Sequence, residues 1–171
     1  MTVRLIAIAA GAALALSASE AAAPQILSFN CDAVPGEVTA MDQSHLTNST
    51  AISGSFRAVQ VRHDNNASPV ATVKLASDKD FVALQITPIE PNSSTFLIFV
   101  RNGDAKEEER TMLGQAELNQ PVPFRIARNG KQVDVSAAGQ SLSLRQSFRG
   151  TPSLGVTCST GQFLFENLEV R

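Results

Sequence analysis

The chain of 171 residues contains no tryptophan and no tyrosine, and it has only two cysteines and two histidines. Sugar-binding sites commonly use exposed Trp or Tyr rings, so their absence argues against an ordinary sugar-stacking site. Two cysteines are too few for a disulfide-rich scaffold or a cysteine-rich metal centre. Two histidines are too few for a histidine-rich zinc site, and we expect neither a metal nor a cofactor.

The chain also lacks a charge excess and a long apolar run. Its formal net charge is −2, so it has no basic surplus of the kind that binds nucleic-acid phosphates. The apolar run Leu5–Leu16 is shorter than the roughly 20 residues that a transmembrane helix needs. We therefore expect no nucleic-acid partner and no membrane-spanning segment. The length fits a single domain.

The N-terminal segment has the pattern of a secretory leader. Arg4 supplies a positive start, the apolar run follows, and small residues fill Ser17–Ala23. This order predicts a cleavable signal peptide over residues 1–23 and a mature domain over residues 24–171. An uncleaved membrane anchor is the alternative. The sequence therefore predicts a secreted or periplasmic protein.

The two cysteines, Cys31 and Cys158, lie near opposite ends of the mature chain. In an oxidising compartment a disulfide between them is the default expectation, and two buried thiols are the alternative. The bridge would close a long loop and hold the first and last strands together. A catalytic cysteine is not supported, because neither His45 nor His63 lies in a recognisable nucleophile motif.

Apolar and polar residues alternate along most of the chain, which is the pattern of half-buried strands. Such runs cover residues 71–75, 82–86, 122–126, 133–135, 142–144 and 154–158. Thr95–Val100 is apolar at both parities, which predicts a central strand covered on both faces and more buried than any other. Asn129-Gly130 predicts a tight hairpin. Further turns are predicted at Asn102–Asp104, Ala138–Gln140 and Ser159–Gly161.

A charged segment at residues 104–113 interrupts this alternation. Asp104 is a suitable helix cap, and Lys106, Glu107 and Glu108 favour helix. We expect a solvated loop or a single helical turn here, with a longer helix as the alternative. A calcium site is disfavoured, because consecutive Glu side chains cannot all face one ion and EF-hand spacing is absent.

The C-terminal third carries the most specific pattern. The segment Pro123–Val135 (PFRIARNGKQVDV) is followed by Ser153–Val156 (SLGV) and then by Thr160–Val170 (TGQFLFENLEV). These phrases resemble the closing portion of concanavalin A-like jelly rolls, the superfamily of laminin-G-like and glucanase-like domains. The resemblance covers Pro121–Arg171 in detail and the earlier strands by pattern only. It implies an all-β, two-sheet antiparallel jelly-roll sandwich whose N- and C-terminal strands lie side by side.

The final strand fits such a core if it contains one irregularity. Phe163 and Phe165 have one parity, whereas Leu168 and Val170 have the other. A one-residue bulge near Glu166-Asn167 would return all four side chains to the core. We expect the phenylalanines to be core residues rather than a ligand platform, in particular Phe96, Phe124, Phe163 and Phe165.

Catalytic motifs are missing. Glucanases of the superfamily carry an E-x-D-x-x-E arrangement on one strand, and retaining hydrolysis needs carboxylates about 5 Å apart. In this chain Glu107, Glu108 and Glu109 are adjacent in a polar segment, and Glu166 and Glu169 lie beside the predicted bulge. No G-x-S-x-G, H-E-x-x-H or P-loop motif is present. An enzyme is therefore the less favoured interpretation.

The remaining candidate for a ligand site is a polar cluster at the end of one predicted strand. Arg57 and Arg62 lie on that strand, and His63, Asp64 and Asn65 follow it. Together they offer charges and hydrogen-bonding groups to a polar ligand. A solvent-facing strand with a polar turn is the alternative interpretation.

The sequence thus predicts a secreted, non-catalytic β-sandwich that serves as a binding or accessory module. Its expected partner is a glycan or a cell-envelope component. One alternative is a glycoside hydrolase or lyase of the same fold with an atypical site. The other is a structural domain that interacts with proteins, because one fold supports many functions.

Overall fold

The computed structural model describes residues 25–43, 51–62, 66–104, 106–150 and 152–171. This part of the chain contains ten β-strands and no helix, so no helix in it could cross a membrane. The strands are β1 (Gln25–Gln43), β2 (Ala51–Val61), β3 (Val70–Ala76), β4 (Phe81–Pro88), β5 (Thr95–Gly103), β6 (Glu108–Glu117), β7 (Val122–Asn129), β8 (Gln132–Ala137), β9 (Gln140–Arg145) and β10 (Ser153–Val170). The leader expected at residues 1–23 lies outside the described residues and stays a prediction.

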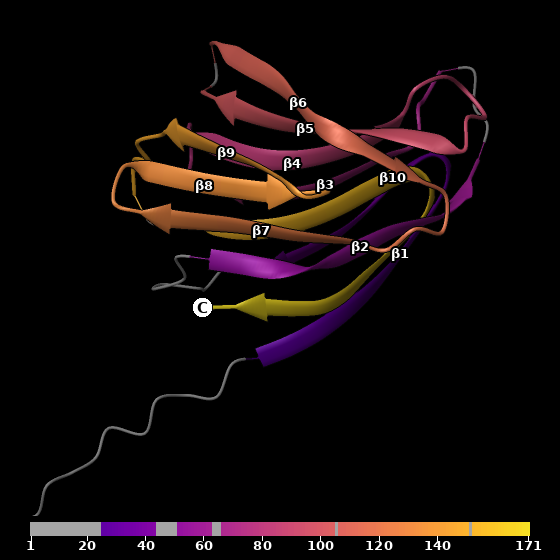
Figure 1. The fold of residues 1–171 in the computed structure, drawn as a ribbon, viewed down its shortest axis with the longest axis horizontal. Coiled ribbons are helices and arrows are strands. Elements are labelled where there is room, and N and C mark those ends of the chain that lie inside the picture. The colour runs from indigo at the N-terminus through magenta and orange to yellow at the C-terminus, as the bar shows by residue number, and fades with distance from the viewer. Residues whose placement is uncertain (1–24, 44–50, 63–65, 105, 151) are drawn as a thin grey trace, which may run out of the picture.

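The strands form an antiparallel sandwich of two sheets (Figure 1). The first sheet has the order β6-β5-β4-β3 and ends on the first half of β10. The second sheet has the order β9-β8-β7-β2 and ends on the second half of β10. Strand β1 runs along β10 through both halves, so the first and last strands are neighbours. The predicted all-β, two-sheet jelly-roll sandwich is confirmed.

The long strand β10 passes from one sheet to the other at Thr160. Residues Ser153–Ser159 pair with β3, and Gly161–Val170 pair with β2. Thr160 has a φ of +51°, which is unusual for a β-branched residue. Its hydroxyl accepts a hydrogen bond of 3.2 Å from the backbone N–H of Gly36. The turn predicted around this residue is therefore a sheet-changing corner, because pairing with β1 continues on both sides of it.

Inward side chains from both sheets form one core. Phe163 of β10 meets Phe96 of β5 edge-on, with ring centroids 6.2 Å apart. Phe124 of β7 lies against Phe56 of β2 at the same distance. The phenylalanines predicted to be core residues are all at most 4% exposed: Phe96, Phe124, Phe163 and Phe165. Edge-on and tilted contacts between aromatic rings are favourable, so these pairs help to join the strands.

The predicted bulge in the last strand is confirmed. Asn167 has a φ of +53°, and the pairing of β10 with β2 shifts between Glu166 and Glu169. The bulge returns Leu168 to the core, where it is 1% exposed. Gly54 of β2 faces the bulge, and a Cβ at this position would lie 2.9 Å from the Glu166 carbonyl oxygen. Glycine is therefore needed where the two strands approach each other.

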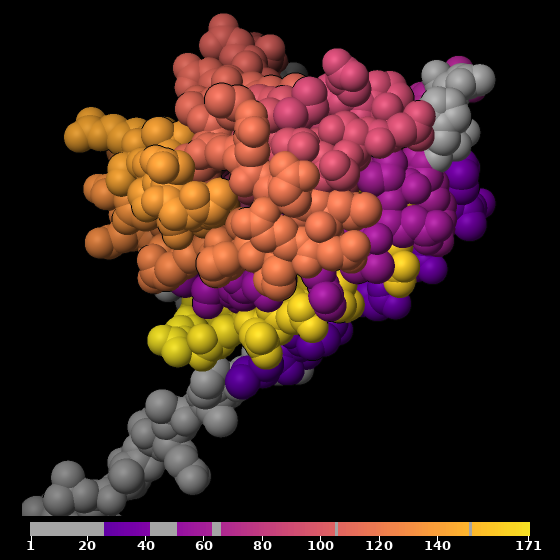
Figure 2. Space-filling model, turned by 45° about the vertical axis from the view of Figure 1, so that its right-hand side comes forward, coloured from indigo at the N-terminus to yellow at the C-terminus, as the bar shows by residue number. Residues whose placement is uncertain are grey.

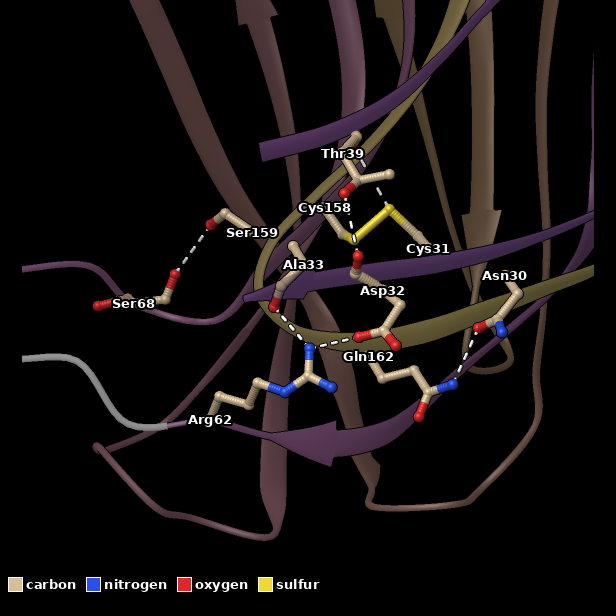
Figure 3. The surroundings of a disulfide bond; sticks show 10 residues. All are labelled: Asn30, Cys31, Asp32, Ala33, Thr39, Arg62, Ser68, Cys158, Ser159 and Gln162. Carbon is tan, nitrogen blue, oxygen red and sulfur yellow. Dashed lines mark hydrogen bonds and ion pairs between the residues drawn. A yellow bond between two sulfur atoms is a disulfide. The ribbon is translucent and has the colours of Figure 1, made fainter. Parts of the chain in front are cut away.

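Cys31 of β1 and Cys158 of β10 form a disulfide, with Cα atoms 6.0 Å apart. The two residues are not opposite each other, because Cys31 faces Phe163 and Cys158 faces Thr39 in the β1–β10 pairing. Each cysteine lies in a different half of this pair. The bond therefore spans the corner where the pair passes between the sheets (Figure 3). Both cysteines are at most 2% exposed.

The expectation that Thr95–Val100 is covered on both faces is wrong. These residues lie in β5, next to the edge strand β6 of the first sheet. Ile98 is buried, whereas Phe99 faces outward and is half-buried. The Arg110 guanidinium lies 3.5 Å from the centroid of the Phe99 ring. A long cationic side chain, rather than a further layer of protein, covers Phe99 on this outer face.

For residues 104–113, both the expected loop or single helical turn and the alternative helix are wrong from Glu108 onward, because strand β6 begins there. Asp104 lies in a turn and accepts hydrogen bonds from the backbone N–H groups of Lys106 at 2.8 Å and Glu107 at 3.1 Å. Strand β6 then begins at Glu108 and pairs with β5. The Arg101 Nε donates to the Glu108 carboxylate at 2.7 Å across this pair. Strand pairing outweighs the helix propensity of the charged residues, which is only a weak preference.

The predicted hairpin between β7 and β8 is confirmed, with its turn one residue later than expected. Asn129 ends β7 and faces Gln132, so Gly130 and Lys131 form the turn. Gly130 has a φ of +62°. The turn predicted at Ala138-Gly139 joins β8 to β9, and both residues have positive φ, as a type I′ turn requires.

At one end of the sandwich, Asp80 connects the loop between β3 and β4 to the loop between β9 and β10. Its side chain is 6% exposed, and its carboxylate accepts hydrogen bonds from the backbone N–H, Nε and Nη2 of Arg149, at 3.0, 3.2 and 3.2 Å. The side-chain hydrogen bonds from Arg149 hold the pKa of Asp80 below its ordinary value. This ion pair joins residues 69 positions apart in the sequence.

Candidate functional site

Arg57 lies on β2 and Arg62 directly follows the end of that strand, and the two do not form one cluster in the structure. The Arg57 guanidinium lies 3.6 Å from the Glu166 carboxylate on the neighbouring strand β10. Its Nε is buried and has no hydrogen-bond partner among the described residues. Between the two arginines, the pairing of β2 with β10 is irregular. Its register shifts between the pair Gln60–Gln162 and the pair Ala58–Phe163.

Arg62 lies at the corner of the sandwich, beside the disulfide (Figure 3). Its guanidinium donates hydrogen bonds to the Asp32 carboxylate and to the Ala33 carbonyl, the latter at 2.7 Å. Arg62 therefore ties the end of β2 to β1. It also lines a cavity of about 120 Å³ together with prolines 69, 88 and 91.

His63, Asp64 and Asn65, the other three predicted site residues, lie outside the described residues. A ligand site made of all five residues stays a prediction. The described part of the chain instead shows a larger polar arrangement that includes Arg57 and lies mainly on other strands.

This arrangement is the outward surface of the second sheet, which we call the polar face. Figure 2 shows the strands of the second sheet in sequence on one side of the molecule, from β7–β9 in orange through β2 and β10 to β1 in indigo. Alternation places polar side chains outward on each strand while apolar side chains fill the core. The polar face consists of Ser53, Ser55, Arg57, Arg125, Asp134, Ser136, Ser141, Ser143, Gln162 and Glu166.

A hollow of about 500 Å³ lies on the polar face, and we call it the Arg125 hollow. Arg125 of β7 is in register with Ser53 of β2 on one side and with Ser136 of β8 on the other. Ser141 of β9 is in register with Ser136 and also lines the hollow. Within the described residues, Arg125 makes no hydrogen bond and no ion pair. The exposed Arg125 thus shares the lining of this hollow with three serines.

Asp134 lies on β8 next to this hollow and is already bound by donors. Its carboxylate accepts hydrogen bonds from the Gln132 amide at 2.9 Å and from the Ser143 hydroxyl at 2.5 Å. These two bonds, together with the positive charge of Arg125, hold the pKa of Asp134 below its ordinary value. The carboxylate is therefore ionised at neutral pH, and its hydrogen bonds fix its position on the face.

The bulge at Asn167 places two further carboxylates on the outward side of β10. Glu166 is opposite Ser55 and forms the ion pair with Arg57. Glu169 accepts hydrogen bonds from Arg171, at 2.9 Å from Nε and 2.7 Å from Nη2. Each carboxylate thus has an arginine beside it.

No family model matches this sequence, and no curated protein matches it. Solved structures do match it. The Crh5 transglycosylase in complex with NAG has a TM-score of 0.63 at 12% identity, with 89% of this chain and 77% of that chain covered. The alginate lyase from Alteromonas sp. 272 has a TM-score of 0.58 at 13% identity, covering 72% of this chain and 71% of that one. The carbohydrate-binding module CBM66 from Bacillus subtilis has a TM-score of 0.50 at 6% identity, with coverages of 85% and 90%.

These likenesses, together with the sheet order, define the class of fold. The chain has an antiparallel jelly-roll fold like that of these structures, which is the fold that the C-terminal sequence pattern implied. Identities of 6% to 13% establish the fold and leave the site to be argued from this chain's own residues.

Sequence reasoning missed the Arg125 hollow, although it predicted the strand that carries Arg125. The polar parity of residues 122–126 is visible in the sequence. The sequence does not show that β2 and β8 flank this strand, which brings Ser53 and Ser136 beside Arg125. Serines at polar strand positions are common, so they gave no separate signal.

Proposed function

We propose that this chain is an exported, non-catalytic module that binds a glycan or another cell-envelope component on the polar face. The proposal includes a leader at residues 1–23 and a mature domain at residues 24–171. The disulfide between Cys31 and Cys158 supports an oxidising compartment, because cytosolic thiols are kept reduced. The fold shared with a carbohydrate-binding module supports the ligand class.

The observation that carries the proposal is the Arg125 hollow. The hydroxyls of Ser53, Ser136 and Ser141 surround it, and a hydroxyl both donates and accepts hydrogen bonds, as the hydroxyls of a sugar do. The chain has no Trp or Tyr on which a sugar ring could stack. Hydrogen bonds and the guanidinium of Arg125 would therefore provide most of the binding, and the ligand must be strongly polar.

Of the residues predicted from the sequence, Arg57 belongs to the polar face, and we propose that it contacts one edge of the ligand. The Arg57 side chain is 33% exposed, so the accessible nitrogens of its guanidinium can donate hydrogen bonds to a ligand acceptor. We propose Arg62, His63, Asp64 and Asn65 as a second polar contact at the end of β2.

The test compares a bulky side chain in the hollow with the same side chain on the other sheet. Ser141 on the edge strand β9 and Gln115 on the edge strand β6 are both exposed. We expect Ser141→Tyr to weaken binding to the best ligand of a glycan array about tenfold or more. The matched control Gln115→Tyr should leave binding within about twofold. Equal effects of the two variants would refute the proposed site.

Glycoside hydrolysis is the second candidate, and one observation favours it. The bulge places Glu166 and Glu169 on the same outward side of β10, and a pair of carboxylates is the requirement of most glycosidases. Polysaccharides incubated with the protein should release no new reducing ends. Turnover that disappears in Glu166→Gln or Glu169→Gln would replace the non-catalytic proposal with this one.

A further inference from the structure

Beside the polar face, Lys131 in the β7–β8 turn and Arg145 at the end of β9 add two cations to Arg125, so this end of the surface has more positive than negative groups. Arg125, Lys131 and Arg145 are exposed, and within the described residues none of them forms an ion pair. The one carboxylate among them, Asp134, is already hydrogen-bonded by Gln132 and Ser143. Arg125 acts electrostatically on Asp134, and Arg145 also lines a hollow with Asp104, Glu107 and Glu109. Within the described residues, however, no carboxylate is in direct ion-pair contact with these three cations.

Two separate hollows carry these charges. The first is the Arg125 hollow, of about 500 Å³. The second, of about 400 Å³, is lined by Lys131, Gln132, Arg145 and Ser147. On β8, Ser136 is opposite Arg125 of β7, and Gln132 is opposite Arg145 of β9. Ser136 and Gln132 are four positions apart along β8. Ordinary strand spacing and rise then separate the Cα atoms of Arg125 and Arg145 by about 16 Å.

Arginine is suited to one class of ligand group. Its planar guanidinium donates two parallel hydrogen bonds to a carboxylate or a sulfate, and such charge-assisted bonds are stronger than neutral ones. A neutral sugar would leave Arg125 without a direct ion-pair partner. Two arginines in hollows separated by this distance suit a chain with repeated acidic groups better than a single small anion.

We infer that the ligand of the polar face is an acidic glycan chain, carboxylated or sulfated, whose acidic groups bind Arg125 and Arg145. This inference rests on the proposed function, and it adds the charge of the ligand and the two arginines that bind its acidic groups. The hydroxyls of the serines that line the Arg125 hollow would bind the sugar hydroxyls. Asp134 lies between the arginines and would repel an acidic group bound beside it. A glycan whose acidic groups are spaced apart should therefore bind better than one with an acidic group on every position.

The experiment measures binding of the mature domain to pairs of polymers that differ only in charge. Polygalacturonate is compared with its methyl-esterified form, and dextran sulfate with dextran. We expect binding to at least one acidic polymer and about tenfold weaker binding, or none, to its neutral counterpart. The binding should also weaken as salt is added, because exposed charges are screened.

Variants then separate a specific site from general charge attraction. Arg125→Gln and Arg145→Gln should each weaken binding to the acidic polymer about fivefold to tenfold. The control Arg110→Gln makes the same charge change on the outward face of the first sheet and should change binding less than about twofold. Equal losses in all three variants would show that the net charge, and not this site, attracts the polymer.

The outcomes also distinguish this inference from the proposed function. Binding of the neutral polymer as tightly as the acidic one, unchanged in Arg125→Gln but lost in Ser141→Tyr, would overturn the acidic ligand and keep the glycan-binding site. Absence of binding to every polymer and every array glycan would overturn both. Binding to dextran sulfate alone or to polygalacturonate alone would support the inference and identify the acidic group.

Discussion

Removing the link between Cys31 and Cys158 should destabilise the protein more than any other change to its covalent structure. The two cysteines are 127 residues apart in the sequence, so the disulfide closes a loop that includes nearly the whole described chain. In the chain-entropy treatment, closing a loop of this length raises the free energy of the unfolded state by about 5 kcal/mol at 25 °C. The net stability of a single domain is on the order of 5–15 kcal/mol. Reduction should therefore remove between a third and nearly all of it.

The assay is urea unfolding of the oxidised and the reduced wild-type protein. With no Trp or Tyr in the chain, far-ultraviolet circular dichroism is the appropriate signal. Both cysteines are at most 2% exposed, so the protein has to be reduced while unfolded and then refolded in the presence of the reductant. We expect the free energy of unfolding to fall by about 5 kcal/mol. The urea slope should rise, because the unlinked unfolded chain exposes more surface.

The double variant Cys31→Ala/Cys158→Ala supplies the control. It lacks the link in either condition, so the reductant should not change its unfolding curve. It should be somewhat less stable than the reduced wild-type protein, because two buried sulfur atoms are lost from the core. A difference below about 1 kcal/mol between the oxidised and reduced wild-type proteins would refute the loop-entropy argument.

Two further predictions concern the bulge and the loops at one end of the sandwich. Gly54→Ala places a Cβ 2.9 Å from the Glu166 carbonyl oxygen and should lower the free energy of urea unfolding by about 1–3 kcal/mol; an unchanged midpoint would contradict the close approach at the bulge. Asp80→Asn removes a carboxylate whose pKa is lowered, first of all by the side-chain hydrogen bonds from Arg149. Because the folded pKa is the lower one, the stabilisation is fully present above the unfolded pKa of about 4 and disappears as pH falls through the folded pKa. The difference in urea midpoint between wild type and Asp80→Asn should therefore be constant near neutral pH and become smaller below about pH 4. The exposed control Asp78→Asn should show a smaller difference from wild type. A difference for Asp80→Asn that grew in acid would contradict the stabilising role of the Asp80 carboxylate.

Much of the local structure could be predicted from the sequence because it depends on neighbouring residues. Period-two alternation located most of the strands, and the change of parity between Phe165 and Leu168 located the bulge. Where local preference and strand pairing conflict, pairing prevails. Glu108 begins a strand although its neighbours favour helix, because β5 provides a hydrogen-bonding partner.

The candidate site could be predicted only in part, because it depends on strand order. Arg57 and Arg62 are close in the sequence but bind different partners, Glu166 and Asp32, on different strands. Arg125 and Ser53 are far apart in the sequence and directly opposite in the sheet. No spacing rule along one chain contains this information.

The sequence by itself determined the class of fold, the positions of most strands and which of their faces is buried. Alternation and turn residues indicate a β-sandwich or barrel, its strands and their buried faces, and the C-terminal resemblance implies the jelly roll. Only the tertiary structure decided that β10 crosses between the sheets at Thr160, and that β2, β7 and β8 are adjacent. The physical reason is that a strand's neighbours are chosen by the packing of the whole core. The unpaired charge of Arg125 is consequently a property of the assembled sheet.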